Sequence, residues 1–258
     1  MNRVCLTNDD GPHSSGLQKL AATLKQLTDL TVVIPDGQRS ATGKALTFNR
    51  PLRITEKDAD GYKLILHDGT PADSVCVAQS FVENIDLFIS GINTGANVGY
   101  QSMFTSGTVG AVMEAALLGY PGIAVSRVSE TKDWFNSDGI KHDYKKECEV
   151  TIEIAQRVLE RGLPRRIDGL NLNFPSEVSD DCSIVLTKPA RLRMHNDLVR
   201  RVDPNGSLYY WIRGIENEPE PNTDVFEILR KGNISLSPII IESANDFDLE
   251  ALTEFLRD

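Results

Sequence analysis

The chain has 258 residues, and 27 Lys and Arg against 37 Asp and Glu give it a formal net charge of −10. This length suits one large α/β domain, or a core with an arm, and is enough to bury a substantial core. The acidic balance argues against a nucleic-acid backbone or an anionic membrane as a stable partner. We find no apolar signal segment and no membrane-length apolar stretch, so we expect a cytoplasmic protein. The four cysteines lie far apart without C-x-x-C pairing, which excludes a zinc pattern and a small disulfide framework.

A short apolar strand, Val4–Thr7, runs directly into Asn8, Asp9, Asp10, Gly11 and Pro12. Two adjacent carboxylates are costly neighbours unless a cation lies between them. On a regular strand their side chains would point to opposite faces, but Gly11 and Pro12 supply a bend that lets them converge. Ligands bind at the carboxyl ends of strands in open α/β sheets. A plain surface turn is the alternative, since Asp-Gly is common in turns; we favour a metal site.

A βαβ unit follows from the next two elements. Leucines at helical spacing from Leu17 to Leu27 precede a strand at Thr31–Ile34, which Pro35 ends. This order predicts a parallel sheet with a right-handed crossover. The loop 37–44 then lies at the same sheet edge as Asp9 and Asp10. It is not a P-loop, because five residues separate its glycines where four are needed.

Two further strands and a helix follow. We expect strands at Leu46–Thr55 and Tyr62–His67, as a hairpin-like excursion from the sheet. Thr70 is a good N-cap and Pro71 suits the first helical position, so a helix is predicted over 72–82. Its dipole accounts for an acidic residue at Asp73, which we interpret as structural.

The most informative stretch runs from Ser90 to Gly119 and follows a buried strand at Ile85–Ile89. Glycines recur every four residues, interleaved with Asn93 and Asn97, and Ser106-Gly107-Thr108 then opens an apolar helix. Free N–H groups and the positive end of the helix dipole at that turn suit an oxyanion. The spacing is not the dinucleotide pattern G-x-G-x-x-G. An ordinary Gly-Asn turn is the alternative.

The rest of the chain divides near residue 187. Strands at 122–125, 169–174 and 183–187, with a helix at 144–161, complete a predicted core over 1–187. The segment 188–258 begins with a predicted β-hairpin, and the family resemblance given below implies an arm after it, with a last strand at 234–241 and a last helix at 247–256. The hairpin's second arm carries Tyr209, Tyr210 and Trp211, which could stack on a base or form an oligomer contact. We favour the oligomer contact.

Several of these motifs, in this order, resemble the stationary-phase survival protein family of SurE-type nucleotidases. They are Asn8-Asp9-Asp10-Gly11, Ser40 in its polar loop, Gly69–Asp73, SGINTGANVG and SGTVGAVMEA. The match covers most of Met1 to Arg127, whereas the C-terminal half matches only in scattered pieces. The resemblance implies a Rossmann-like, mostly parallel sheet flanked by helices. It also implies a C-terminal hairpin and arm, not an independent domain, that assembles a homodimer or homotetramer.

The resemblance also implies a site. Metal ligands would be Asp9, Asp10, Ser40 and Asn93, an oxygen-only set that suits one Mg²⁺ or Mn²⁺ per subunit better than zinc. Asn97, Ser106, Gly107 and Thr108 would hold the substrate phosphate. Asp9 or Asp10 would also accept a proton from the attacking water, and the sequence does not assign which.

The expected activity is metal-dependent hydrolysis of nucleoside monophosphates to nucleoside and phosphate, as a 5′-nucleotidase with 3′ activity left open. The alternatives are a broader phosphatase that also trims polyphosphate, and a nucleotide-binding module without chemistry. A covalent aspartyl-phosphate route is disfavoured because the chain lacks Asp-x-Asp at the site. His13 could protonate the leaving group, although a solvated role fits it equally well. Thr105, Ala115 and the segment 188–191 depart from the family pattern.

Overall fold

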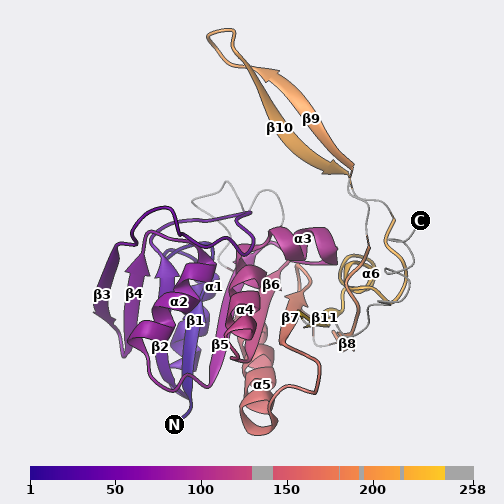
Figure 1. The fold of residues 1–258 in the computed structure, drawn as a ribbon. Coiled ribbons are helices and arrows are strands. Elements are labelled where there is room, and N and C mark those ends of the chain that lie inside the picture. The colour runs from indigo at the N-terminus through magenta and orange to yellow at the C-terminus, as the bar shows by residue number, and fades with distance from the viewer. Residues whose placement is uncertain (130–141, 180, 192–194, 216–217, 242–258) are drawn as a thin grey trace, which may run out of the picture.

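A nine-stranded mixed sheet forms the body of the protein. The computed structural model describes residues 1–129, 142–179, 181–191, 195–215 and 218–241. The strand order is β3-β4-β2-β1-β5-β6-β7-β11-β8 (Figure 1). In chain order the elements are β1 (Arg3–Thr7), α1 (Ser15–Leu24), β2 (Asp29–Pro35), β3 (Ile54–Ala59), β4 (Tyr62–His67), α2 (Pro71–Phe81), β5 (Leu87–Thr94), α3 (Gly99–Thr105), α4 (Gly107–Leu117), β6 (Gly122–Arg127), α5 (Lys145–Arg161), β7 (Gly169–Phe174), β8 (Ile184–Leu186), β9 (His195–Val202), β10 (Leu208–Ile215), α6 (Asp224–Phe226) and β11 (Ile234–Ile239).

Six neighbouring strands, from β4 to β7, are parallel, as the βαβ opening predicts. β1 lies between β2 and β5, so the strand order reverses direction at the β1–β5 pair. In such sheets ligands bind outside the carboxyl ends of the strands at this reversal. β1 ends at Thr7 and β5 at Thr94, and the two are paired through Thr7 and Ser90. The predicted site residues therefore come to the point that the topology favours.

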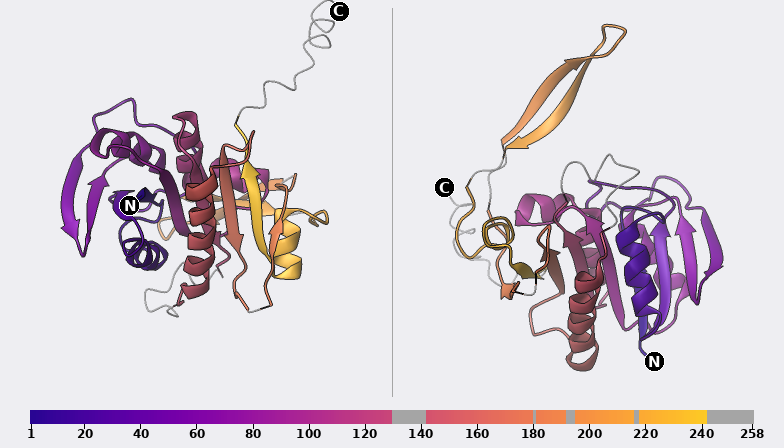
Figure 2. Two further views of the ribbon diagram at one scale, coloured as in Figure 1. Left: turned by 90° about the horizontal axis from the view of Figure 1, so that it is seen from below. Right: turned by 180° about the vertical axis from the view of Figure 1, so that it is seen from behind.

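Helices cover both faces of the sheet, as Figure 2 shows. On one face α1 and α5 pack together, with Leu20 and Ile154 in the larger apolar core. On the other face α2 and α4 pack together, with Val75 and Ala111 in a second core. Both faces of β1 and β5 are thus buried, which explains their continuous apolar runs.

The hairpin-like excursion before α2 is confirmed, but its first strand lies later in the chain than predicted. β3 runs from Ile54 to Ala59 rather than from Leu46 to Thr55, and it pairs antiparallel with β4. Thr47 and Arg53 donate their backbone N–H groups to the side chains of Asp73 and Asp68, at 2.9 Å each. These side-chain acceptors replace a ladder partner, so 46–53 folds as an irregular connection.

The far edge of the sheet uses residues from the predicted arm. β11 lies between β7 and β8, antiparallel to β7 and parallel to β8. Residues beyond 187 thus contribute a strand to the main sheet, and the division at 187 stays a prediction. The last helix, predicted at 247–256, lies outside the described residues.

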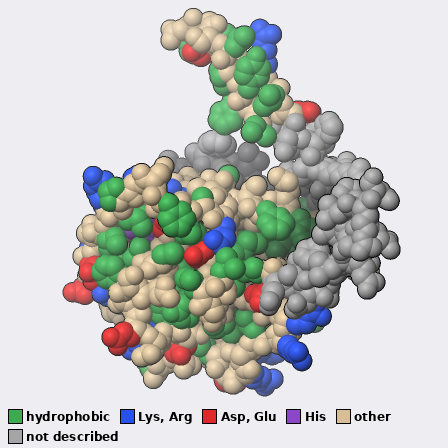
Figure 3. Space-filling view, in the orientation of Figure 1, with side chains coloured by type: hydrophobic (Ala, Val, Ile, Leu, Met, Phe, Trp, Pro, Cys, Tyr) green, Lys and Arg blue, Asp and Glu red, His purple; other side chains and the backbone are tan. Residues whose placement is uncertain are grey.

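β9 and β10 form a two-stranded antiparallel hairpin that points away from the sheet (Figures 1 and 2). Its apolar side chains lie on the surface, where Figure 3 shows them in green. Leu198 is 67% exposed, Trp211 63% and Ile212 74%. Within the described part of the chain, no helix is both long and apolar enough to cross a bilayer.

Candidate active site

The loop after β1 is closed by Asn8. The Asn8 side chain donates to the carbonyl oxygen of Gly11 at 2.9 Å and accepts from Gly11 N–H at 3.2 Å. Gly11 has a φ of +82°, and a Cβ there would lie 3.0 Å from the backbone of Gly37. Glycine at this position therefore allows both the turn and the close approach of the next loop.

Asp9 is buried against the start of α4. The Thr108 hydroxyl donates to its Oδ1 at 2.6 Å. Burial raises the pKa of Asp9, and its hydrogen bonds with Thr108 and with backbone groups, including those of Gly107, oppose that shift. The same helix N-terminus was predicted to hold phosphate. In this structure its donors contact a carboxylate that carries the negative charge such a terminus favours.

Asp10 lies beside Asp9 and contacts the end of β5. The backbone N–H of Thr94 donates to its Oδ2 at 3.1 Å. Burial, and then the charge of Asp9, raise the pKa of Asp10 to about 6, while hydrogen bonds with Thr94 oppose the shift. Asp9 is buried and Asp10 half-buried, and the charge of Asp9 adds to the cost of ionising Asp10, so the pair is suited to a cation.

The loop that carries Ser40 is anchored beside Asp9. Arg39 donates its backbone N–H to the Asp9 carbonyl oxygen at 2.7 Å. The Ser40 side chain is exposed, and its hydroxyl accepts from Gln38 at 2.9 Å. Further along, Gly43 donates to the Thr105 carbonyl oxygen at 2.9 Å. The loop is thus fixed at both ends of the site, with Ser40 at its exposed middle.

The two cations of this loop are engaged by other groups. The guanidinium of Arg39 pairs with Asp36 at 2.7 Å and donates to the Gly69 carbonyl oxygen at 3.1 Å. Lys44 forms an ion pair with Glu114, a buried residue of α4. Both side chains thus hold the loop against its neighbours.

Asn93 reaches the site through an irregularity at the end of β5. The register between β5 and β6 shifts between Ser90 and Asn93. Gly91 has a φ of +143°, and a Cβ there would lie 2.3 Å from the Val125 carbonyl oxygen. Asn93 is 9% exposed and donates its amide nitrogen to the Gly95 carbonyl oxygen at 2.7 Å. Its amide oxygen is the atom available as a cation ligand.

Asn97 is fixed by the neighbouring strands β6 and β7. Its backbone N–H donates to Asn173 Oδ1 at 2.8 Å, and its carbonyl oxygen accepts from Asn171 at 2.9 Å. Its side-chain nitrogen donates to the Ser126 hydroxyl at 2.8 Å. Both β7 asparagines are fully buried. This network holds Asn97 in one position beside the carboxyl ends of the strands.

α4 begins at Ser106 and Gly107, where other segments of the chain pack closely against the helix. Ser106 is the N-cap, and its hydroxyl accepts from Val109 N–H at 3.1 Å. A Cβ at Gly107 would lie 3.0 Å from each of three atoms, Asp9 Cβ, Pro71 Cγ and the Thr42 hydroxyl oxygen. The helix N-terminus, the Asp9 loop and the Ser40 loop therefore meet at this glycine.

The remaining flagged residues are placed as follows. Asp73 forms a capping box with Thr70, which confirms its structural role. His67 is buried between the Ser74 hydroxyl at 2.8 Å and Gly69 N–H at 3.1 Å, and burial lowers its pKa to about 4. His13 is exposed. All four cysteines are free.

Sequence reasoning missed three contributors. Thr94 was missed because it acts through its backbone N–H, which carries no sequence signal. The Asn171 and Asn173 pair does carry one, since two alternate asparagines in an otherwise apolar strand indicate a polar network on one face. Asp224, described below, lies in one of the scattered C-terminal pieces that resemble the family, Thr223-Asp224-Val225, but the sequence assigned it no role.

The donors gathered here fit a hard divalent cation. Asp9, Asp10 and Asn93 offer carboxylate and amide oxygens, with the Ser40 loop tied to the same turn. Among the described residues, no group of three or more His, Cys, Asp or Glu could hold a metal. The carboxylate and amide oxygens of Asp9, Asp10 and Asn93 are of the ligand type that suits Mg²⁺ or Mn²⁺ better than a soft metal.

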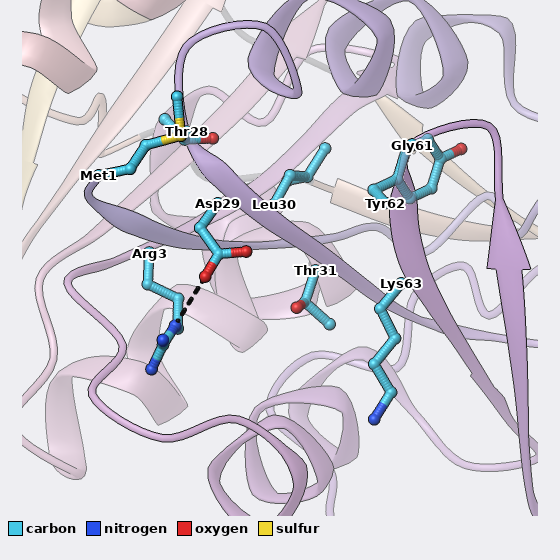
Figure 4. A pocket seen from close by; sticks show the side chains of 9 residues that line it. All are labelled: Met1, Arg3, Thr28, Asp29, Leu30, Thr31, Gly61, Tyr62 and Lys63. Atoms are coloured by element: carbon cyan, nitrogen blue, oxygen red, sulfur yellow. Dashed lines mark hydrogen bonds and ion pairs between the residues drawn. The ribbon is translucent and has the colours of Figure 1, made fainter.

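A pocket of 630 Å³ lies at the opposite, amino end of the strands. Arg3, Asp29, Tyr62 and Lys63 are among the side chains that line it (Figure 4). Arg3 pairs with Asp29 at 3.1 Å, and Lys63 pairs with Glu56 at 2.6 Å. Its cations are thus matched by carboxylates, and none of the predicted site residues lines it.

Comparison with known proteins shows which family the chain belongs to. The family model described as Survival protein SurE matches residues 4–196. A protein of Thermofilum pendens named 5′-nucleotidase SurE is 36% identical over 256 residues, covering 99% of this chain and 96% of its own. One of the same name from Methanothrix thermoacetophila is 38% identical over 264 residues, covering 100% of this chain and 99% of its own.

A solved structure agrees over the whole length. The SurE protein from Aquifex aeolicus superimposes with a TM-score of 0.80 at 30% identity, covering 99% of this chain and 100% of its own. The family model, the full-length relatives and this structure lead to one conclusion: the chain belongs to the SurE survival protein family.

Proposed function

We propose that the protein is a hydrolase of the 5′-nucleotidase type, which converts nucleoside monophosphates to nucleoside and inorganic phosphate with one Mg²⁺ or Mn²⁺ per subunit. Relatives that match nearly the full chain carry the name 5′-nucleotidase. The observation that carries the proposal is the buried pair Asp9 and Asp10 at the β1–β5 reversal, beside the N-terminus of α4.

In the proposed site Asp9, Asp10, Asn93 and Ser40 hold the cation. When bound, it lowers the pKa of a coordinated water and screens charge on the phosphoryl group. Ser40 lies in a loop that the Arg39–Asp9 backbone hydrogen bond anchors beside Asp9.

The phosphate is proposed to lie against Asn97, Ser106, Gly107 and Thr108. In this structure these groups already have partners: the Asn97 side chain donates to Ser126, Ser106 caps α4, and Thr108 donates to Asp9. The Gly107 and Thr108 backbone groups also hydrogen-bond Asp9, so a bound phosphate would share or take over these donors at the helix N-terminus, where negative charge is favoured. Asp9 or Asp10 is proposed also to accept a proton from the attacking water.

The direct test measures phosphate release from a panel of 5′- and 3′-nucleoside monophosphates, with Mg²⁺, Mn²⁺ or chelator. An Asp9→Asn variant is the inactive control. We expect release that requires the metal and falls by at least about a hundredfold in the variant. A folded wild-type protein that binds nucleotide but releases no phosphate with either metal would favour the binding module instead. Equal turnover of short polyphosphate would favour the broader phosphatase.

We further propose that the hairpin mediates assembly of a homodimer or homotetramer. One of its faces presents Leu198, Val202, Leu208, Tyr210 and Ile212, all more than 36% exposed. An isolated two-stranded hairpin is marginal in water, so such a surface needs a partner. A second copy of this chain is the partner that the family resemblance supports.

A further inference from the structure

The C-terminal part of the chain contacts the candidate site through one buried carboxylate, Asp224. Its Oδ2 accepts a hydrogen bond from Gly99 N–H at 2.7 Å. Its Oδ1 accepts from Ala190 N–H at 2.9 Å and from Val225 N–H at 2.7 Å. Asp224 is fully buried, which raises its pKa, and backbone N–H groups oppose that shift.

Asp224 joins the two stretches that flank the hairpin. Residues 188–190 precede β9, and residues 223–225 follow β10. Lys188 forms a bridge with Thr223, and the Asp224 N–H donates to the Lys188 carbonyl oxygen at 3.1 Å. We name these two stretches the clasp. Because its members are hydrogen-bonded to each other, they contact α3 as a unit.

The clasp holds the first residues of α3. The Tyr100 N–H donates to the Ala190 carbonyl oxygen at 3.0 Å, next to the Gly99–Asp224 bond. Gly99 has a φ of +72°, and a Cβ there would lie 3.4 Å from the Ala190 carbonyl oxygen and 3.5 Å from Val225. The turn into α3 is thus fixed by two hydrogen bonds and by close packing on one side.

This turn connects the two halves of the predicted phosphate site. Gly99 is two residues after Asn97, and α3 runs from Gly99 directly to Ser106. Asn97 is held from the other side by Asn171 and Asn173. The clasp and these asparagines together determine where Asn97 lies relative to the start of α4.

We propose that Asp224 is a positioning residue of the phosphate site, which fixes the Gly99 turn and thereby sets Asn97 and α3 in place. The inference rests on the proposed function for the identity of the site. It adds that residues at the base of the hairpin act on phosphate binding from a distance.

A carboxylate suits this position better than an amide. Asp224 accepts three hydrogen bonds with two oxygens, whereas asparagine would place its NH₂ group against an N–H donor. Asp224→Asn therefore keeps the size of the side chain but loses at least one charge-assisted bond. We expect turnover to fall by about tenfold or more.

The matched control is Thr223→Val in the same segment. The Thr223 hydroxyl accepts from Phe226 N–H at 3.4 Å and donates to the Glu220 carbonyl oxygen at 2.6 Å. These bonds stabilise α6 and do not reach α3. The control thus removes side-chain hydrogen bonds to Glu220 and Phe226 and leaves the bonds of Asp224 to Gly99 and Ala190 in place.

Four measurements on the full-length protein test the proposal. Thermal unfolding shows that each variant is folded at the assay temperature. Amide hydrogen exchange measures how well the Gly99 and Tyr100 N–H groups are protected from solvent. Binding of inorganic phosphate with Mg²⁺, by calorimetry, reports the site without needing turnover. Turnover is measured with a nucleotide and with a simple phosphomonoester.

We expect Asp224→Asn to expose the Gly99 amide, weaken phosphate binding and slow both substrates by a similar factor, with Thr223→Val close to wild type. Unchanged phosphate binding in folded Asp224→Asn would overturn the proposal. Equal losses in both variants would also overturn it, since they would show only a stability effect. A wild-type protein that binds inorganic phosphate but hydrolyses neither substrate would overturn the proposed function and leave the positioning role of Asp224 standing.

Discussion

Two effects raise the pKa of Asp10. Its carboxylate is buried, and the Asp9 carboxylate lies beside it, so ionisation of Asp10 costs free energy in the metal-free protein. The ordinary pKa of an aspartate, 3.8, is raised to about 6 in the folded state. The folded state therefore holds a proton on Asp10 over a range of pH in which the unfolded chain has lost it.

The sign of the effect follows from this difference. Between about pH 4 and pH 6 the folded state binds more protons at Asp10, so the free energy of unfolding falls as the pH rises. Above pH 6 Asp10 is ionised in the folded state, which then bears the full free-energy cost of that charge. We predict that Asp10→Asn stabilises the metal-free protein by up to about 3 kcal/mol at pH 7.5, and by much less at pH 4.

Urea unfolding with chelator present, at pH 7.5 and at pH 4, measures this difference. The exposed Asp58→Asn is the control, and we expect it to change little at either pH. The same stability difference at both pH values for Asp10→Asn would contradict the account. A variant that is more stable without metal and inactive with it would show that the site keeps a costly charge pair for its cation.

At the scale of elements, the position of the Ser40 loop depends on its contact with α4. A Cβ at Gly110 would lie 2.3 Å from the Gly43 carbonyl oxygen and 2.9 Å from Lys44 N. The helix and the loop backbone therefore meet at a position that allows no side chain. The Lys44–Glu114 ion pair and the Gly43–Thr105 hydrogen bond hold the loop at the same place.

We predict that Gly110→Ala moves this loop away from α4 and with it Ser40. The expected cost in stability is about 1–3 kcal/mol, because the loop backbone has to shift. Metal affinity should fall as well, which calorimetric titration with Mn²⁺ measures. Leu117→Ala, at a 55% exposed position of the same helix, serves as the control. Wild-type metal affinity in Gly110→Ala would show that the loop does not depend on this contact.

The elements predicted with success are those whose signal is local. The capping box at Thr70 and Asp73 and the continuous apolar run of β5 each depend on adjacent residues. The segment 46–53 was misjudged because its backbone groups bind the side chains of Asp68 and Asp73, which propensity does not reveal. The position of β11 between β7 and β8 is also non-local, and no pattern within Ile234–Ile239 indicates it.

The site divides in the same way between features with a local sequence signal and features that depend on distant residues. Asp9 and Asp10 could be found because two adjacent carboxylates after a strand carry their own chemical signal. Their environment could not be found, since Thr94 and Thr108 reach them from 84 and 99 residues away. The roles assigned to Ser40 and Asn97 came from the family resemblance, and they stay predictions.

At the scale of the whole molecule, the hairpin is the feature that a single chain does not explain. Leu198 lies opposite Ile212 on one of its faces, and Leu208 opposite Val202. All four side chains are exposed. We predict that Leu198→Glu with Ile212→Lys yields monomers or smaller assemblies, because burying these charges in an interface is unfavourable.

Light scattering and sedimentation measure the assembly, and urea unfolding of the core gives the control. We expect the core to keep its stability, since β9 and β10 make their main contacts with each other. Leu186→Ala, which removes an exposed apolar side chain elsewhere on the surface, should leave assembly unchanged. An unchanged molar mass in the double variant would contradict a role for the hairpin in assembly.

The place of β11 has a consequence for how the chain acquires its structure during synthesis. β8 pairs only with β11 among the described strands, and β11 is the last of them to be made. The six parallel strands can assemble first, as the N-terminal part emerges. Until Ile239 is available, β7 is an open edge and β8 has no partner, and unpaired edges promote association between chains. We therefore expect the nascent chain to be most prone to aggregation after Phe174 has been translated and before Ile239 has been.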